Sequence, residues 1–281
     1  VCTDADGDSF AVEGGDCGLI DCNDANPQVY PDAVEVCGNY IDDNCNGRVD
    51  DADRACNPVP NVVFVGWDGT QRDHFWQCFN EELAECEGGL PNIAQFDIYN
   101  STVTNGETET KPGWAQLFTG YNADITGVYN NGVYQPIPEG YTLFEKVENQ
   151  FGVDKVVTMF ISGKAEHTGG ACIGDPTTKN GLPVIEDQGQ PWCITKEHLD
   201  YYENGSFTNP TIGNRALELL EQHQHDQILA AFIFRNPDVL GHLAGEDSVH
   251  YSQGIVDDDY WLGKIVEKLK NLGIYEQTLV Y

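Results

Sequence analysis

The stretch Val62-Val-Phe-Val-Gly-Trp-Asp-Gly69 sets the architecture of most of this chain. Its apolar run, Val62–Trp67, has the length and the β-branched and aromatic content of a strand buried on both faces. Asp68 follows this run directly. A carboxylate in that place lies at the carboxyl end of a strand, where parallel sheets bind ligands. A simpler interpretation is that Asp68 only caps the helix that follows.

Similar apolar runs recur along the chain and alternate with helical patterns. Strands are expected at Val62–Trp67, Lys155–Ile161, Gln227–Phe234 and Thr278–Tyr281. Helices are expected at Arg72–Glu87, Pro112–Thr119, Tyr141–Gln150, Pro210–His223 and Ser248–Leu272. The stretch Cys172–Cys193, rich in Gly and Pro, is expected to be a long loop. The alternation predicts an α/β domain whose mostly parallel sheet is covered by helices on both faces.

The charge and the apolar content of the chain limit the classes of partner that it is expected to bind. The 281 residues include 14 Lys and Arg against 46 Asp and Glu, so the formal net charge is −32. This balance argues against nucleic acid or an anionic membrane surface as the main partner, and it suits divalent cations. A hydrophobic share of 40% is enough for a packed core. No apolar run approaches the roughly 20 residues of a membrane span.

The composition changes sharply near residue 57. Residues 1–56 hold 14 acidic residues and no Lys, with little apolar periodicity. Such a segment buries too little apolar surface to fold without disulfides or bound ions. We therefore expect a small irregular module at 1–56, a Pro-containing linker at 57–60 and the α/β part at 61–281. The open strand pattern at the end of the chain, and the lack of a leader at its start, suggest a fragment at both ends.

The cysteines indicate disulfides. Six of the ten lie in residues 1–56 and four in the rest, so each part has an even number. No paired Cys-x-x-Cys spacing occurs, which makes metal thiolates the second interpretation. Disulfides imply an extracellular, cell-surface or periplasmic location. The spacing leaves the connectivity open.

The best calcium loop of the acidic segment runs from Asp42 to Asp53. Its oxygen ligands stand at the EF-type positions 1, 3, 5, 9 and 12, and Gly47 stands at position 6. The expected ligands are Asp42, Asn44, Asn46, Asp50 and Asp53. Asp53 replaces the usual Glu, and its shorter side chain predicts weaker binding. The alternative is a solvated acidic linker.

Two weaker acidic clusters precede that loop. Asp4, Asp6 and Asp8 keep the alternating acids, but Ser9 stands where the EF spacing requires Gly. Asp16 is spaced to close this loop around a calcium ion. A looser cluster comprises Asp21, Asn23, Asp24 and Asn26. For both clusters, solvated surface acids are an equal alternative.

The whole of residues 1–56 resembles the Asp/Cys-rich metal-binding modules of secreted bacterial proteins. The resemblance is carried by Asp4-Ala-Asp-Gly-Asp8, Gly14-Gly-Asp-Cys17, Asp21-Cys-Asn-Asp24, Val29-Tyr-Pro-Asp-Ala-Val-Glu-Val-Cys37 and Asp42-Asp-Asn-Cys-Asn-Gly47. Cys22, in addition to the usual Cys17, is a departure that leaves the disulfide pattern open.

Two further places in the α/β part carry chemistry. Asp238 and His242 follow the third strand four residues apart, and oxygen with imidazole suits zinc or manganese. A structural His at a turn is the alternative. Thr110 precedes the helix at Pro112, where free N–H groups and the helix dipole favour a phosphate. A metal-bound hydroxyl there can act as a nucleophile, and an ordinary helix cap is the alternative.

Together these residues resemble the alkaline phosphatase superfamily, most closely its type I phosphodiesterase/nucleotide pyrophosphatase branch. The matching motifs, in order, are Val62-Val-Phe-Val-Gly-Trp-Asp-Gly69, Thr110-Lys-Pro with Leu117-Phe-Thr-Gly120, Thr126-Gly-Val-Tyr-Asn-Asn131 and Asp238-Val-Leu-Gly-His242. The resemblance spans residues 61–281 but not a complete domain of that family.

The resemblance implies a role for each matching residue. Asp68 and Thr110 would hold one metal ion, with Thr110 as the nucleophile. Asp238 and His242 would hold a second ion. Asn131 would stabilise the negative charge that develops on the phosphoryl group.

The family's remaining ligands, an Asp-His pair and a later His, would follow the strand that starts at Thr278. The chain as given is therefore expected to be inactive alone, although its parent is expected to be an enzyme. Lys164, after the second strand, would face a substrate phosphate, and a surface charge is the alternative.

The combined expectation is a secreted hydrolase of phosphodiester or pyrophosphate bonds. It would carry two zinc or manganese ions in the hydrolase site and calcium in the N-terminal module. Its partners would be a small phosphate-ester substrate and divalent ions. The alternative is a calcium-dependent surface or adhesion protein whose hydrolase-like domain is inactive. Sulfatase chemistry is disfavoured because no Cys-x-Pro-x-Arg run is present.

Overall fold

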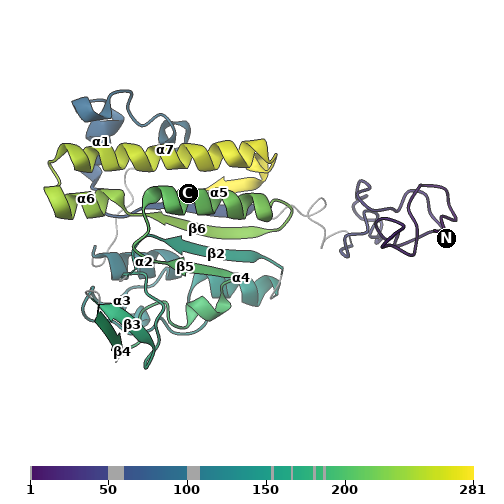
Figure 1. The fold of residues 1–281 in the computed structure, drawn as a ribbon, viewed down its shortest axis with the longest axis horizontal. Coiled ribbons are helices and arrows are strands. Elements are labelled where there is room, and N and C mark those ends of the chain that lie inside the picture. The colour runs from purple at the N-terminus through teal and green to yellow at the C-terminus, as the bar shows by residue number, and fades with distance from the viewer. Residues whose placement is uncertain are drawn as a thin grey trace. The chain divides into compact units, whose positions relative to one another are not determined.

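The chain divides into two compact units, Val1–Pro60 and Asn61–Tyr281 (Figure 1). The structure is a computed structural model that describes residues 2–49, 60–99, 108–152, 155–165, 167–179, 182–185 and 188–281. Each unit is described by itself below.

A five-stranded parallel sheet forms the centre of the second unit, in the order β5-β2-β6-β1-β7. Its strands are β1 (Asn61–Trp67), β2 (Val157–Ser162), β5 (Tyr201–Asn204), β6 (Ile228–Phe234) and β7 (Thr278–Val280). β6 lies in the middle and is buried along its whole length. A strand of seven consecutive apolar residues is typical of a sheet that is covered on both faces.

Helices cover both faces of this sheet (Figure 1). Helices α5 (Asn209–Gln222) and α7 (Val249–Asn271) pack on one face, against Ala230, Phe232 and Phe234 of β6. Helices α2 (Thr110–Thr119) and α4 (Leu143–Phe151) pack on the other face, against the alternate residues of the same strand. The α/β architecture with a parallel sheet is therefore confirmed.

The remaining elements are short or lie at the edges. They are α1 (Arg72–Phe79), η2 (Ala84–Cys86), η3 (Ile93–Gln95), α3 (Ala123–Thr126), β3 (Pro176–Lys179), β4 (Leu182–Ile185), η4 (Thr195–His198), α6 (Asn236–Ala244) and η5 (Tyr275–Gln277). The antiparallel pair β3–β4 lies within the stretch that was expected to be a loop.

The helix expected over Arg72–Glu87 ends early, at Phe79. Glu81 has a φ of 57°, which a continuing α-helix does not allow. The chain then turns back so that Cys86 forms a disulfide with Cys78. The apolar residues of α1 and η2 together follow one helical spacing, and this explains why the sequence suggests one long helix.

The N-terminal unit is irregular, as its composition predicts. In its described part, β-bridges are limited to isolated ones between Ala11 and Ile20 and between Gly15 and Gly18. The disulfides Cys2–Cys17 and Cys22–Cys45 cross-link the segment, and Cys37 is also disulfide-bonded. The α/β unit has two of its own, Cys78–Cys86 and Cys172–Cys193.

Candidate functional site

Asp68 lies directly after β1, at the carboxyl edge of the sheet, and only 6% of its surface is exposed. Its backbone N–H donates to the carbonyl of Phe234, the last residue of β6, across 3.0 Å. Its own carbonyl accepts from the N–H of Asp238 at 3.1 Å. The ends of two neighbouring strands therefore hold Asp68 and Asp238 next to each other.

Gly69 makes this close approach possible. Its φ is +74°, and a Cβ atom added there would lie 2.5 Å from Cβ and 2.6 Å from Cα of Asp238. Both the backbone conformation and the available space exclude a side chain. The turn Asp68-Gly69 thus needs glycine so that the α6 backbone can pass beside it.

Asp238 and His242 both lie on α6, one helical turn apart. Nε2 of His242 is 3.6 Å from Oδ1 of Asp238. The His242 side chain is 81% exposed, whereas that of Asp238 is 15% exposed. The structure therefore brings this pair together on a helix and not on a turn, with the imidazole at the solvent-exposed rim.

Thr110 is the first residue of α2 and is half-buried. The N-cap of this helix is Glu109, so Thr110 is not the cap residue of the simpler interpretation. Further along the helix, Trp114 donates from Nε1 to Oδ1 of Asp68 at 3.2 Å. This bond connects the first turns of α2 to the carboxyl edge of the sheet, where the positive end of the helix dipole favours an anion.

Asn131 also reaches the start of α2. Its Oδ1 accepts from the backbone N–H of Lys111 at 2.9 Å. Its own N–H donates to Oε2 of Glu109 at 2.7 Å. Asn131 is therefore held beside the two residues that flank Thr110, although it lies on a loop 21 positions further along the chain.

Lys164 lies between the two carboxylates. Its Nζ is 2.8 Å from Oδ2 of Asp68, and it also forms an ion pair with Oδ2 of Asp238. The Lys164 side chain is only 7% exposed. The structure thus excludes the surface-charge interpretation and places the ammonium group inside the site, paired with two candidate metal ligands.

Burial raises the pKa of the Asp68 carboxyl, the neighbouring Lys164 ammonium lowers it, and the Asp238 charge raises it further. An ammonium group between two largely buried carboxylates marks this place as one that attracts cations. The carboxylates, a hydroxyl and an imidazole form a donor set that fits zinc or manganese. Among the described residues of this unit, however, no three His, Cys, Asp or Glu side chains bring their ligand atoms within 4.8 Å of one another.

Two side chains that the sequence does not single out, Tyr251 and Trp114, hold the residues at this edge of the sheet in place. The hydroxyl of Tyr251 donates to the carbonyl of Gly69 at 2.6 Å and accepts from the N–H of Gln71 at 2.8 Å. Trp114 orients Asp68 as described above. Tyr251 lies on α7, some 180 residues from the turn that it fixes, and no local pattern reveals such a contact.

A second candidate site lies in the N-terminal unit. One carboxylate oxygen from each of Asp6, Asp8 and Asp21 lies within 4.8 Å of the other two, and Asp4, Asp6 and Asp24 form a similar group. The two acidic clusters that the sequence shows separately therefore meet, and Asp16 belongs to neither group. Burial, followed by the charges of the neighbouring acids, raises the pKa of Asp6.

Side-chain oxygens of the Asp42 loop accept hydrogen bonds from the backbone of the same loop. Asp42 accepts from the N–H groups of Asn46 (3.1 Å) and Gly47 (2.8 Å), and Asn46 accepts from that of Arg48 (2.8 Å). Asp50 and Asp53, the expected closing ligands, lie outside the described residues. The role of this loop in calcium binding stays a prediction.

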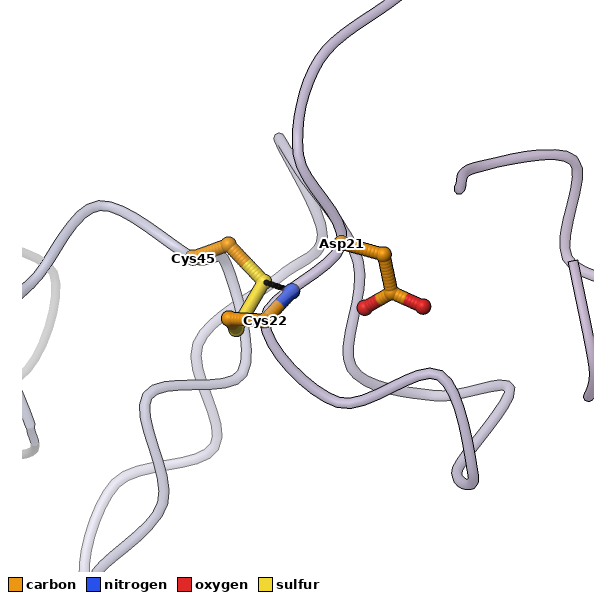
Figure 2. Close-up of side chains that lie close together, drawn as sticks. All are labelled: Asp21, Cys22 and Cys45. Atoms are coloured by element: carbon orange, nitrogen blue, oxygen red, sulfur yellow. Dashed lines mark hydrogen bonds between the residues drawn. A yellow bond between two sulfur atoms is a disulfide. The ribbon is translucent and has the colours of Figure 1, made fainter. Parts of the chain in front are cut away.

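A third group in this unit, Asp21 with Cys22 and Cys45, is not a thiolate site. Figure 2 shows that the two sulfur atoms are joined in a disulfide, and the N–H of Cys22 donates to Sγ of Cys45 at 3.2 Å. Disulfide sulfur is not the thiolate that zinc or copper prefers. The usable ligand atoms here are oxygens.

Two families match this chain. Residues 83–281 match the family described as "Type I phosphodiesterase / nucleotide pyrophosphatase". Residues 21–51 match the family described as "Putative metal-binding motif".

Curated relatives are distant. GPI ethanolamine phosphate transferase 1 of Schizosaccharomyces pombe is 23% identical over 76% of this chain and 23% of its own length. Bis(5'-adenosyl)-triphosphatase ENPP4 of Homo sapiens is 22% identical over 82% of this chain and 48% of its own. The chain thus spans less than half of these relatives.

Solved structures share the fold. Murine ectonucleotide pyrophosphatase/phosphodiesterase 5, an inactive form in complex with AMP, is 15% identical with a TM-score of 0.51, over 79% of this chain and 55% of that one. A Bacteroides thetaiotaomicron protein linked to glycosaminoglycan metabolism is 14% identical with a TM-score of 0.52, over 79% and 60%. At such identities the likeness establishes the architecture alone.

Proposed function

Since this chain belongs to the type I phosphodiesterase/nucleotide pyrophosphatase family, we propose that the complete protein is a metal-dependent hydrolase of phosphodiester or pyrophosphate bonds. The observation that carries this proposal is that Asp68 is bonded both to the backbone of Asp238 and to Trp114 of α2, the helix that begins at Thr110. The bond from Lys111 to Asn131 connects the loop that bears Asn131 to the same helix.

Asp68 and Thr110 would hold one divalent ion, zinc or manganese, and Asp238 with His242 would hold a second. Bound ions of this kind neutralise charge and lower the pKa of a coordinated hydroxyl or water. Thr110 would attack phosphorus in line with the leaving group and form a phosphothreonine ester, which water then hydrolyses. The Asn131 side chain and the positive end of the α2 dipole would stabilise the developing negative charge.

We also propose that the N-terminal unit binds calcium through its oxygen ligands and that the protein is extracellular or periplasmic. The match to a metal-binding motif and the disulfides in both units support this. Among the described helices, none combines the length and apolar character that crossing a bilayer requires.

One observation favours a second candidate, a calcium-dependent surface protein with an inactive hydrolase-like domain. Lys164 already forms ion pairs with both Asp68 and Asp238, and its ammonium group competes with metal ions for the same oxygens. The two candidates differ in whether the complete protein binds zinc or manganese at this edge and hydrolyses a phosphodiester.

Variants of Thr110 in the complete protein test the proposed function. Thr110→Ala should remove nearly all turnover of a chromogenic phosphodiester, because no other hydroxyl replaces the nucleophile. Thr110→Ser should keep part of it, because only a methyl group is lost. Metal content, measured by mass spectrometry, should stay within about a factor of two in Thr110→Ser, which retains the metal-binding hydroxyl.

A merely structural Thr110 would give a different result. Its loss at the start of α2 would lower the stability of the protein and leave the chemistry intact. An alanine variant that is less stable yet turns over at near wild-type rate would refute the nucleophile. A wild-type protein with no turnover at saturating metal would favour the inactive alternative.

A further inference from the structure

Asp21 is the buried member of the acidic groups in the N-terminal unit. Only 3% of its surface is exposed. Its Oδ1 accepts from the N–H of Asn23 at 2.8 Å. Its Oδ2 is fully buried and has no hydrogen-bond partner among the residues that the structure describes. A buried carboxylate oxygen without a partner costs free energy unless a cation compensates it.

Two further carboxylates share this feature. Oδ1 of Asp6 accepts from the N–H of Asp8, and Oδ1 of Asp8 accepts from that of Phe10. In each residue the second oxygen, Oδ2, is buried and again lacks a partner within the described ranges. In all three acids, therefore, Oδ1 accepts a backbone hydrogen bond within the loop, and Oδ2 is left to bind a ligand.

The spacing of these oxygens fits a single calcium ion. One oxygen from each of Asp6, Asp8 and Asp21 lies within 4.8 Å of the other two. Oxygens that bind the same calcium at about 2.3–2.6 Å can be at most about 5 Å apart. Oxygen-only donors suit a hard cation, and the nearby sulfurs of Cys22 and Cys45 are engaged in a disulfide.

In the described part of this segment, no basic side chain forms an ion pair with these three acids. Residues 1–56 contain no Lys, and their two Arg residues are Arg48 and Arg54. No ion pair involving Asp6, Asp8 or Asp21 occurs among the described residues. A cation from solution would supply the compensating charge.

We propose that Asp6, Asp8 and Asp21 form one calcium site that joins the first acidic loop to the start of the metal-binding motif, with Asp4 and Asp24 beside it. Two of its three ligands precede residue 21, where the match to that motif begins. The N–H of Ala5 already donates to Oδ1 of Asp24 at 2.7 Å, so the same two loops are in contact. The ion would add a cross-link between these loops to the disulfides Cys2–Cys17 and Cys22–Cys45 of the unit.

Calcium titration calorimetry of the whole 281-residue chain, with its disulfides intact, tests this proposal. Asp8→Asn and Asp21→Asn should weaken the same binding event, each by at least tenfold, because each removes one of its charges. The double variant should lose that event and leave any other untouched. Asp16→Asn is the matched control, since it removes an acid of the same unit that lies outside both groups, and its calcium affinity should equal that of wild type.

Two results would overturn the joint site. The first is that Asp8→Asn and Asp21→Asn weaken two different binding events, which would mean separate calcium loops. The second is that both variants bind calcium like the Asp16→Asn control. Disulfide mapping by mass spectrometry and matching circular dichroism would show that each variant has folded. The hydrolase site takes no part in this experiment, so either failure leaves the proposed catalytic function standing.

Discussion

At the scale of single residues, the geometry of the candidate hydrolase site depends on positions that have no chemistry of their own. Gly69 lets the backbone of α6 approach Asp68, and Tyr251 fixes the carbonyl of that glycine. Trp114 orients the carboxylate itself. The chemical residues Asp68 and Asp238 could be found from the sequence because they follow apolar strands. Their supports could not, because the contacts join distant segments.

Gly69→Ala is expected to be markedly destabilising. The methyl group would meet Cα and Cβ of Asp238 at 2.6 and 2.5 Å, in addition to the strain of a φ of +74°. Such strain alone costs roughly 1–3 kcal/mol. Gly120→Ala is the control, because Gly120 has a φ of +76° but nothing within 4 Å of the added Cβ. Urea unfolding should show the larger loss at Gly69, and equal losses would contradict the argument.

At the scale of elements, β1, β6 and α7 match the expected ranges to within one residue at each end. These elements have long, unambiguous apolar patterns. The four-residue strand β5 was not expected, because its half-polar sequence at the sheet edge lacks a pattern of its own. No helix was expected around Asp238, but Pro237 fits the first turn of a helix and α6 forms there.

A buried network connects α5, α6 and α7 behind the site. Asn209 donates to Asp258 at 2.5 Å and to Asp257 at 2.8 Å, and Asn236 donates to Asp257 at 2.7 Å. Asn209 also accepts from the N–H of Arg235 at 3.1 Å. This network holds the turn that starts α6 and thereby the helix that bears Asp238.

Asp258→Asn is expected to stabilise the protein at neutral pH. Burial raises the pKa of Asp258 well above 3.8, although the bond from Asn209 lowers it. The folded state therefore holds a proton that the unfolded state releases above about pH 4, so wild-type stability falls as pH rises through this window. Each unit of such a shift corresponds to about 1.36 kcal/mol, and an amide avoids this cost.

Urea unfolding at pH 4 and pH 7, with a chelator present, measures this effect. The variant should exceed wild type by about 1 kcal/mol or more at pH 7, and the difference should shrink at pH 4. The exposed Asp124→Asn provides the control, with no change in the pH dependence. A variant less stable than wild type at pH 7 would show that Asp258 is ionised in the folded protein.

At the scale of the whole molecule, two units with different sources of stability share one chain. The α/β unit is stabilised by a packed sheet with helices on both faces, and its class could be predicted from alternating apolar runs. The N-terminal unit depends on disulfides and acidic loops. Its ligand types could be predicted, but not that residues 4–8 and 21–24 meet, because the disulfide connectivity that folds them together cannot be read from spacing.

The central claim is that Thr110 forms a covalent phosphoester during turnover by the complete protein. The most direct measurement is mass spectrometry of the peptide that contains Thr110 after the complete, metal-loaded protein is mixed with a chromogenic phosphodiester and quenched in acid within one turnover. The account predicts that Thr110 carries the mass of the transferred phosphoryl ester, and that Thr110→Ala shows neither this adduct nor release of the chromophore. Release of the chromophore at the wild-type rate with Thr110 unmodified, or with the alanine variant, would contradict it.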